Sequence, residues 1–589
     1  MLLRLFCPTL STAGVVFSGN VSTNFFGSAS VSIIIGNGLG GASGVVDGGS
    51  SFTKTNSPNE RYIYITEGLN AGSSGNSMTV TRPNSFLDCQ AIIVGSAGSS
   101  NQLTVSSGGG IKAINDGGCL QLGSAAGSQG NSVLITDPGS YFTSHGGWFV
   151  NSKNSITIQK GASAIAGYIV LWDNSSVTVS GLAAALNALN TFDFEGSSNS
   201  LAASDGALLT GSLEIQHSSS NNLINVSGTG TYWTNALPNS FALEGLGNSF
   251  VLSSGAQLTS EATFDSRGAF NTMLLNSGSR MESLGDFSWG GSYNTIVLSG
   301  VGTSLTSREL QIGNANYGSN TSDLMVVTNG AHVTGNGNVV VGYGACCYSA
   351  VSNQLVVTGI GSVVDCGTNS IIVGMGTGGG NVLSLQAGGG LVAGNLMVTV
   401  LGRFAFASGT VKTVSASINN GLPFIIGDGI SIGNYIMQGG TNSFSNGLVI
   451  SNNSTLSGCG TVNGSVTNYG TIVTMTGCPM DFFGQVVNYG TILELNGAPV
   501  FHSNFINHGS VLFVDGASAA NASVIGADVV IKFKTMLNYH YDVQTRSNLI
   551  AGIWIPLTNG LVGTGGNITV TNLGGAGGMG GFYRVLLHY

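Results

Sequence analysis

The sequence predicts an all-β protein, a right-handed parallel β-helix followed by a small antiparallel β-sandwich. Three observations support this: the composition, a repeated unit of short strands, and a change of pattern after residue 526. The chain has 589 residues, of which 94 are glycine and only 7% are charged, yet 42% are hydrophobic. Short β-branched runs separated by Gly, Ser and Asn are typical of many short strands joined by tight turns.

The repeated unit begins with Asn, continues with a polar and an apolar residue, and reaches Val or Ile and then Gly. It recurs from Asn76 onward, and Asn248, Asn271 and Asn294 begin three units at a spacing of 23 residues. One unit cannot bury its own apolar face, so the copies must stack with their strands parallel, about 4.8 Å apart. We expect roughly 12 to 18 turns of right-handed winding, a ladder of Asn side chains, and Gly at the corners.

A shorter repeat follows, with the pattern Asn-aromatic-Gly-Thr/Ser-Ile/Val at Asn468, Asn488 and Asn507. This predicts that the β-helix continues with narrower turns, a separate second solenoid being the alternative. Gly is expected to turn the corner, Ile or Val to enter the core, and Asn to stack on Asn.

The patterns divide the chain into four segments. Residues 1–60 are a leader or cap, 61–402 a β-helix with turns of about 23–30 residues, and 403–526 its continuation with turns of about 20. Residues 527–589 have longer alternating strands, such as VVIKFK and YDVQTR, which indicate a sandwich of fibronectin or immunoglobulin type. The start, MLLRLFCPTLSTAGVV, fits either a signal peptide or a truncated gene start.

The charge and hydropathy patterns restrict the partners. Net charge is −9 and the 16 Lys and Arg residues are spread singly, so nucleic acid is not an expected partner. No uninterrupted apolar stretch is long enough for a transmembrane helix. A nearly uncharged Ser/Thr/Asn/Gly surface favours a secreted or cell-surface location, with extracellular polysaccharide or cell-envelope components as partners. The sequence indicates no oligomeric state.

The units of form NxLxVxxxG, the stretch SNNSTLSGCGTVNGSVTNYGTI, and the ending YDVQTRSNL with FYRV resemble secreted bacterial parallel β-helix repeat proteins. These are similar in style to autotransporter passenger domains and the pectin-lyase-like superfamily. The resemblance covers residues 76–589, and its motifs are architectural. No autotransporter membrane barrel is expected, because about 60 residues follow the solenoid and each barrel strand takes about 10.

Five charged residues form the candidate catalytic group. Aligning the strands FDFE, LEIQ, FALE and ATFD on their apolar pairs places Glu195, Glu244 and Asp265 in one outward column, with His217 and Arg267 just beyond it. Glycoside hydrolysis requires paired carboxylates. Adjacent carboxylates also take up cations, so Glu244 and Asp265 are candidate ligands for calcium. The favoured alternative is a solvated acidic stripe that needs no cofactor.

The aromatic position of the shorter repeat is a candidate carbohydrate site. Tyr469, Tyr489 and His508 share one column. Outward rings there would stack on sugar faces, although a purely structural stack is the favoured alternative.

Two cysteines are predicted to come close together. Cys459 and Cys478 lie ten and eleven residues before the aromatic positions Tyr469 and Tyr489, so stacking brings them together. They form either a disulfide or buried free thiols.

The leading functional prediction is a secreted or cell-surface structural, adhesin-like protein that binds carbohydrate and lacks catalytic activity. The alternative is a polysaccharide-active enzyme, a lyase or glycosidase, that uses the region of Glu195, Glu244 and Asp265. The sequence contains no HExxH, Walker A or EF-hand pattern that would indicate another chemistry.

Overall fold

The computed structural model is nearly all β, with a parallel β-solenoid of about 19 turns and antiparallel sheets at the C-terminus. The predicted fold class is therefore confirmed, with slightly more turns than expected. The chain divides into two units, Met1–Cys366 with Val373–Leu383 and Gly367–Ile372 with Ser384–Tyr589. The structure describes residues 15–588, apart from 19–20, 27–29, 37–39, 54–61, 66–72, 116, 237–239, 317, 345–347, 476, 496, 515–520, 536–539, 548–552 and 578–580.

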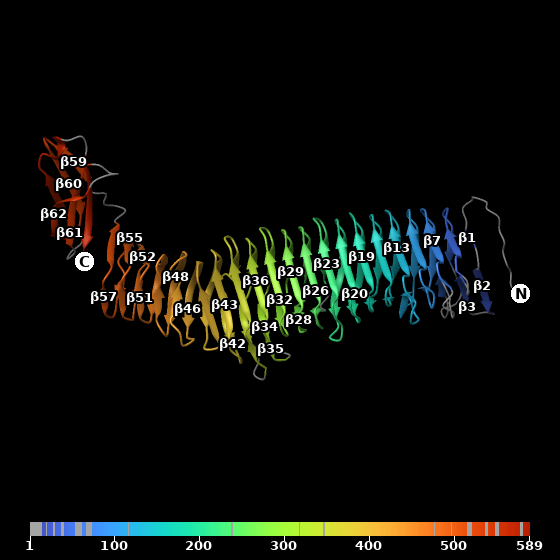
Figure 1. The fold of residues 1–589 in the computed structure, drawn as a ribbon. Coiled ribbons are helices and arrows are strands. Elements are labelled where there is room, and N and C mark those ends of the chain that lie inside the picture. Colours follow the sequence, from blue (N-terminus) through green and yellow to red (C-terminus); the bar gives the residue numbers. More distant parts are fainter. Residues whose placement is uncertain are drawn as a thin grey trace. The chain divides into compact units, whose positions relative to one another are not determined.

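Each complete turn of the first unit contains three strands, which pair with their counterparts in the next turn. Strand β26 (Ser249–Ser253) pairs in parallel with β29 (Thr272–Asn276), with Phe250 opposite Met273. Alternate residues of β26 are buried, so Phe250 and its counterparts line a continuous core. Figure 1 shows these strands side by side along the unit.

Three columns of strands result from this stacking. The first contains β4 (Ser43–Val46), β7 (Ser77–Thr81), β10 (Gln102–Ser106), β13 (Ser132–Thr136), β16 (Ser155–Gln159), β19 (Ser176–Ser180), β21 (Ser200–Ser204), β23 (Leu223–Ser227), β26, β29, β32 (Thr295–Ser299), β36 (Leu324–Thr328) and β40 (Gln354–Thr358). The second contains β5 (Ser51–Thr53), β8 (Phe86–Cys89), β11 (Gly110–Ala113), β14 (Tyr141–Ser144), β17 (Ser163–Ala166), β24 (Tyr232–Asn235), β27 (Gln257–Ser260), β30 (Arg280–Ser283), β33 (Ser304–Ser307), β37 (His332–Gly335) and β41 (Val363–Asp365). The third contains β6 (Tyr62–Ile65), β9 (Ala91–Val94), β12 (Gly118–Leu122), β15 (Gly147–Val150), β18 (Ile169–Leu171), β25 (Phe241–Leu243), β28 (Phe264–Ser266), β31 (Phe287–Gly290), β34 (Leu310–Asn314) and β38 (Val339–Tyr343), while the long strands β20 (Ala185–Phe194) and β22 (Leu208–Ile215) belong to both the second and the third columns.

The first described strands include antiparallel pairs. Strand β1 (Val15–Ser18) pairs with β4, and β2 (Val21–Phe26) pairs with β3 (Ser30–Ile35). From β4 onward the pairing to the next turn is parallel. Of the predicted leader or cap at residues 1–60, residues 1–14 lie outside the described residues.

The predicted ladder of Asn side chains runs through the first unit. The backbone N–H of Asn248 donates to Oδ1 of Asn271 at 2.8 Å, and the N–H of Asn271 donates to Oδ1 of Asn294 at 2.8 Å. Because these side chains are fully buried, the ladder satisfies backbone groups that water cannot reach. The ladder members are Asn76, Asn101, Asn131 and Asn154, and then Ser175, Asn199, Asn222, Asn248, Asn271, Asn294, Asp323, Asn353 and Asn381.

The second unit begins with long strands that pair in parallel and ends with shorter ones. A five-stranded sheet contains the Asn of the shorter repeat, and Nδ2 of Asn468 donates to Oδ1 of Asn488 at 2.7 Å. Nδ2 of Asn488 donates in turn to Asn507 at 2.7 Å, so this predicted ladder is also present. The strands of this solenoid are β44 (Gly390–Val398), β45 (Gly402–Phe406), β46 (Gly409–Ile418), β47 (Phe424–Ile426), β48 (Gly433–Phe444), β49 (Leu448–Ile450), β50 (Ser454–Asn463), β51 (Val466–Asn468), β52 (Thr471–Met475), β53 (Met480–Phe482), β54 (Val486–Asn488), β55 (Thr491–Leu495), β56 (Val500–Phe501), β57 (Phe505–Asn507) and β58 (Ser510–Val514).

The glycine of the shorter repeat has a different role from the one expected. A Cβ on Gly490 would lie 2.2 Å from the carbonyl oxygen of Gly470 in the preceding turn, and a Cβ on Gly509 would lie 2.1 Å from that of Gly490. None of these three glycines has a positive φ. Glycine is therefore required because neighbouring turns approach closely, and the corner itself does not need a left-handed backbone.

The C-terminal part of the second unit consists of two three-stranded antiparallel sheets, as predicted. One sheet contains β59 (Asn521–Ile525), β60 (Asp528–Lys534) and β63 (Asn567–Asn572), and the other contains β61 (His540–Arg546), β62 (Ile555–Val562) and β64 (Phe582–His588). The two sheets share a core of Val529, Ile531, Phe533, Tyr541 and Val543. The described residues contain one short 3₁₀ turn, η1 (Gly575–Gly577), and no helix with the length and hydrophobicity needed to cross a membrane.

Candidate functional site

The predicted carboxylates lie on the outward face of the third column of the first unit, but in a different register from the one expected. Phe264 pairs with Phe241, so Asp265 lies opposite Ala242. Two residues further along, Arg267 is the counterpart of Glu244. Glu244 and Asp265 are therefore not vertical neighbours, and their shared column is a correction to the sequence prediction.

The reason for the error is the two-residue period of a strand. Aligning ATFD with FALE placed Ala262 opposite Phe241, whereas the structure places Phe264 there. A slip of two residues keeps every inward residue inward, so the apolar pattern cannot detect it. The larger Phe ring takes the position because the core is wide enough for stacked rings, and Phe241 and Phe264 lie 5.3 Å apart between ring centroids.

Arg267 joins the two carboxylates that the prediction had placed together. Its Nη2 lies 2.5 Å from Oδ2 of Asp265, and its Nε lies 2.6 Å from the same oxygen. Its Nη1 lies 3.7 Å from Oε1 of Glu244. Asp265 is 6% exposed and the Arg267 side chain is 40% exposed, so the carboxylate is shielded from water while part of the guanidinium is not. The guanidinium supplies the positive charge that the calcium hypothesis gave to a metal ion.

The other two predicted residues take no part in this ion-pair cluster. Glu195 is exposed at the end of β20, and His217 is exposed after β22. Among the described residues, no group of three or more His, Cys, Asp or Glu side chains is arranged to hold a metal ion. Glu195 does contribute electrostatically, because its charge raises the pKa of a neighbouring carboxyl group, that of Asp193.

Asp193 and Glu214 form a carboxylate pair that the sequence analysis missed. They are direct partners on adjacent turns of the same outward face. Nε2 of Gln216 donates to Oδ1 of Asp193 at 3.1 Å and lies 3.2 Å from Oε1 of Glu214. Because both oxygens contact one nitrogen, they are at most about 6 Å apart. Desolvation raises the pKa of Asp193 to about 6, with smaller contributions from Glu214 and Glu195, while the bond from Gln216 opposes the rise.

Two hollows of the first unit lie away from these carboxylates. One of about 290 Å³ is lined by residues that include Ile92, Gly118 and Phe149. Another of about 420 Å³ is lined by residues that include Pro83 and Tyr141. Neither is lined by an acidic residue. The carboxylates of the third column therefore stand on an outward sheet face rather than in either of these hollows.

The predicted aromatic column of the second unit is present as a stack. The rings of Tyr469 and Tyr489 are 5.3 Å apart and nearly parallel, and those of Tyr489 and His508 are 5.1 Å apart. All three residues are exposed and have an ordinary backbone conformation. Within the stack, each ring face is covered by the next ring. A sugar therefore has only the ring edges and the two outermost faces to contact, and carbohydrate binding by these three residues stays a prediction.

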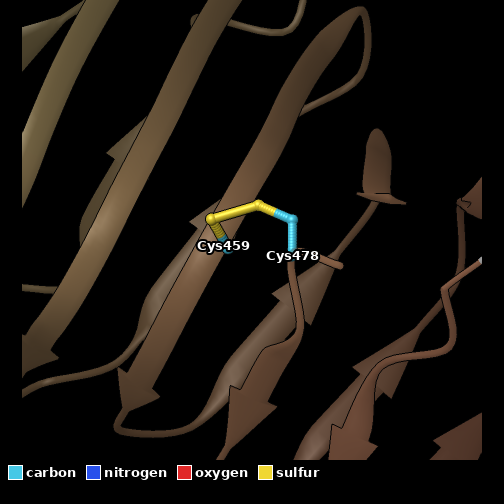
Figure 2. Close-up of a disulfide and its surroundings, with 2 residues drawn as sticks. All are labelled: Cys459 and Cys478. Carbon is cyan, nitrogen blue, oxygen red and sulfur yellow. A yellow bond between two sulfur atoms is a disulfide. The ribbon is translucent and has the colours of Figure 1, made fainter. Parts of the chain in front are cut away.

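Cys459 and Cys478 are joined in a disulfide, as Figure 2 shows. Their Cα atoms are 4.8 Å apart, and 19 residues separate them in sequence. Cys459 lies in β50, and Cys478 lies between β52 and β53, so the bond joins two successive turns. This is one of the two arrangements that the sequence left open.

The other described cysteines are buried free thiols, Cys89, Cys119 and Cys366. Burial raises the pKa of the Cys366 thiol to about 12 and also raises the pKa values of Cys89 and Cys119. Because the thiolate is the reactive form, burial lowers the reactivity of these three thiols.

A column of left-handed residues immediately before the Asn ladder contains two more residues that the sequence analysis missed. Each member has φ between 55° and 77°, and all but two are Gly, Ser, Asn or Lys. Phe270 and Tyr293 are the exceptions, each with φ of 58°. A bulky residue in this conformation costs about 1–2 kcal/mol. The column contains Gly75, Ser100, Gly130, Lys153, Asn174, Ser198, Asn221, Gly247, Phe270, Tyr293, Ser322, Ser352 and Gly380.

These two aromatic residues are exposed and stacked on each other. Phe270 is 58% exposed and Tyr293 is 52% exposed. Their ring centroids are 5.2 Å apart, with an angle of 8° between the planes. The sequence signal was available, because Phe-Asn and Tyr-Asn stand where other units have a small or polar residue before Asn.

Comparison of the sequence with known proteins finds no matching family model and no curated relative.

Proposed function

We propose that the protein is a secreted or cell-surface structural protein of adhesin type. The observation that carries this proposal is that the recurring residues of the repeat hold the solenoid together. The Asn of each unit is buried and bonds to the next turn, and the Gly of the shorter repeat allows neighbouring turns to approach. A repeat whose recurring positions serve stacking is suited to building an extended surface.

The disulfide supports an extracellular location. Disulfides persist in oxidising compartments and are rare in the cytosol of most organisms. The Cys459–Cys478 bond lies in the part of the solenoid that has the shortest turns, where each turn contributes the least core. A covalent link between turns compensates for that smaller core.

The test uses intact cells of the source organism. Antibody labelling and protease treatment of whole cells should reach the protein, and thiol labelling should modify Cys459 and Cys478 only after reduction. Deleting the gene should weaken attachment to polysaccharide-coated surfaces or the integrity of the envelope. A protein that is protected inside intact cells with both thiols reduced would contradict the proposal.

A polysaccharide-active enzyme is the second candidate, and one observation favours it. Asp193 has a pKa raised to about 6, and an oxygen of its carboxyl group lies within about 6 Å of one from Glu214. Retaining glycosidases use two carboxyl groups about 5–5.5 Å apart, one of them a proton donor with a raised pKa. This pair, rather than Glu244 and Asp265, is therefore the one to which the enzyme hypothesis is best applied.

The enzyme hypothesis is tested by screening polysaccharides for the release of reducing ends. Activity that is lost in Asp193→Asn and in Glu214→Gln, and retained in Arg267→Gln, would support the pair as acid and nucleophile. Activity that survives both carboxylate substitutions, or a screen with no product, would exclude this pair as a glycosidase site.

A further inference from the structure

We propose that Phe270 and Tyr293 form a binding platform for a neutral polysaccharide on the first unit. This deepens the proposed adhesin function and rests on it for its biological meaning. The platform combines an aromatic stack, a vacant position beside it, and hydrogen-bonding groups on the same turns.

The backbone conformation is the first argument. Both residues occupy a column where left-handed φ is required, and where Gly, Ser and Asn are the usual occupants. Neither ring is buried, so core packing does not explain why a bulky side chain is placed there. The stack of Tyr469, Tyr489 and His508 differs, because its residues have no positive φ. Strain retained at an exposed position is typical of a functional site.

The vacant position beside Phe270 is the second argument. Gly247 occupies the same column one turn earlier and has no side chain, and Asn221 precedes it by another turn. With turns about 4.8 Å apart, the backbones at Phe270 and Asn221 are separated by about 9.6 Å along the column, and the Asn221 side chain extends into part of that gap. A sugar ring stacked on Phe270 would occupy the remaining part of the gap, above Gly247. A Cβ on Gly247 would lie 3.1 Å from Oδ1 of Asn221, which confirms that the asparagine side chain borders this space.

The chemistry of the lining fits a pyranose. Phe270 is 58% exposed, and the negative face of its ring complements the partial positive charge on the C–H face of a sugar. Leu246, which is 52% exposed, adds an apolar contact next to Gly247. Glu244 and Arg267 lie three residues before Gly247 and Phe270 respectively, so their ion pair places polar groups on the same two turns.

The surrounding charge selects a neutral glycan. Among its described residues, the outward face that leads to the platform carries more carboxylates than basic groups. Asp193, Glu195, Glu214, Glu244 and Asp265 are all on this face, and Arg267 pairs with the last two, while Asp286 and Arg308 of the neighbouring turns pair with each other. A uronate or a sulfated chain would be repelled, whereas a neutral chain of hexose, pentose or N-acetylhexosamine units would not.

The experiment uses the purified full-length chain and an array of oligosaccharides, with neutral tetra- to hexasaccharides of glucose, mannose, xylose and N-acetylglucosamine beside acidic ones. The strongest neutral binder is then titrated by calorimetry into three variants, Phe270→Ser, Tyr293→Ser and Gly247→Asn. Ser and Asn are native occupants of this column, so each variant is expected to fold, which circular dichroism verifies. Phe483→Ser removes an exposed aromatic residue of the second unit and is the matched control.

We expect each platform variant to bind at least tenfold more weakly, and the control to bind within twofold of the wild type. Gly247→Asn is the most specific test, because it fills the vacant position and leaves both rings in place. Wild-type affinity in all three variants, binding of acidic glycans alone, or no binding by the wild type would overturn the platform. If the protein is surface-exposed and binds no neutral glycan, the inference fails while the structural function stands. A protein found in the cytosol contradicts the proposed function whatever the array shows.

Discussion

The backbone N–H of Asn294 donates to Oδ1 of Asp323 at 2.8 Å, which places a carboxylate at a rung of a ladder otherwise built mainly from amides. Asp323 is fully buried, and its second oxygen accepts a hydrogen bond from Nδ2 of Asn320 at 2.5 Å. Desolvation raises the pKa of Asp323 to about 6, against the opposing effect of these donors.

Replacing Asp323 with Asn should stabilise the first unit at neutral pH. The folded protein binds the proton of Asp323 more tightly than the unfolded chain, so this group reduces stability as the pH rises from about 4 through 6. The difference of about two pKa units corresponds to roughly 3 kcal/mol. The Oδ1 atom of Asn320 is buried without a partner. Rotation of the Asn320 amide would allow this oxygen to accept a hydrogen bond from the Nδ2 that Asp323→Asn introduces.

Thermal unfolding of both proteins across pH 3.5 to 7.5 checks this. The variant should gain stability over the wild type as the pH rises, and the two should converge at the acidic end. A constant difference at all pH values would show that Asp323 is not responsible. Asn353→Asp, which adds a second carboxylate to the ladder, should have the opposite effect.

Glu494 should give the second unit a similar pH dependence. Its side chain points into the core of the solenoid, is 2% exposed, and leaves Oε2 without a hydrogen-bond partner. Burial raises the pKa of Glu494 to about 7. The free energy of unfolding of the second unit should therefore fall as the pH rises from about 4.5 through 7. Glu494→Gln should therefore unfold at a higher temperature than the wild type at pH 8, and at a similar temperature at pH 4. Equal melting curves at pH 8 would contradict this.

Removing Arg267 should destabilise the first unit through Asp265. In Arg267→Gln, the nearly buried carboxylate loses its ion pair, at a cost of about 1–3 kcal/mol. Adding Asp265→Asn should restore most of the loss, since no charge is then left without compensation. Chemical denaturation of the two single variants and the double variant measures the coupling. Additive effects would show that the two side chains do not act as a pair.

Breaking the disulfide should lower the stability of the second unit. The bond closes a loop across 19 residues, for which loss of the cross-link costs about 3 kcal/mol. Cys459→Ser and Cys478→Ser should unfold at the same lower denaturant concentration, and a reducing agent should bring the wild type to that value. Insensitivity of the wild type to a reducing agent would show that the bond is absent in solution.

The glycines of the shorter repeat should be intolerant of a methyl group. In Gly490→Ala, the new Cβ would meet a backbone oxygen of the preceding turn, so adjacent turns must separate, at a cost of roughly 3 kcal/mol. Gly421→Ala is the control, because Gly421 has a φ of +79° and open space around it, and only backbone strain of about 1 kcal/mol is expected. A larger loss of stability in Gly421→Ala than in Gly490→Ala would mean that backbone conformation, rather than the close approach of neighbouring turns, makes these glycines intolerant of a methyl group.

The sequence by itself determined the architecture of this protein. The repeated Asn predicted the ladder from Asn76 onward, because a buried column of amides requires one polar residue at a fixed place in every turn. Alternating apolar residues predicted parallel strands around one core, and the change of pattern near the C-terminus predicted the sandwich. These features are local or periodic, so they can be read from spacing alone.

Only the tertiary structure decided which surface residues meet. The register of Asp265 against Ala242 depends on which ring fills the core, and a slip of two residues leaves the inward and outward pattern unchanged. The pairing of Asp193 with Glu214, and the stacking of Phe270 on Tyr293, required that register and the backbone angles at the corner. Periodicity determines which side of the strand a residue faces, but packing determines its neighbour on the next turn.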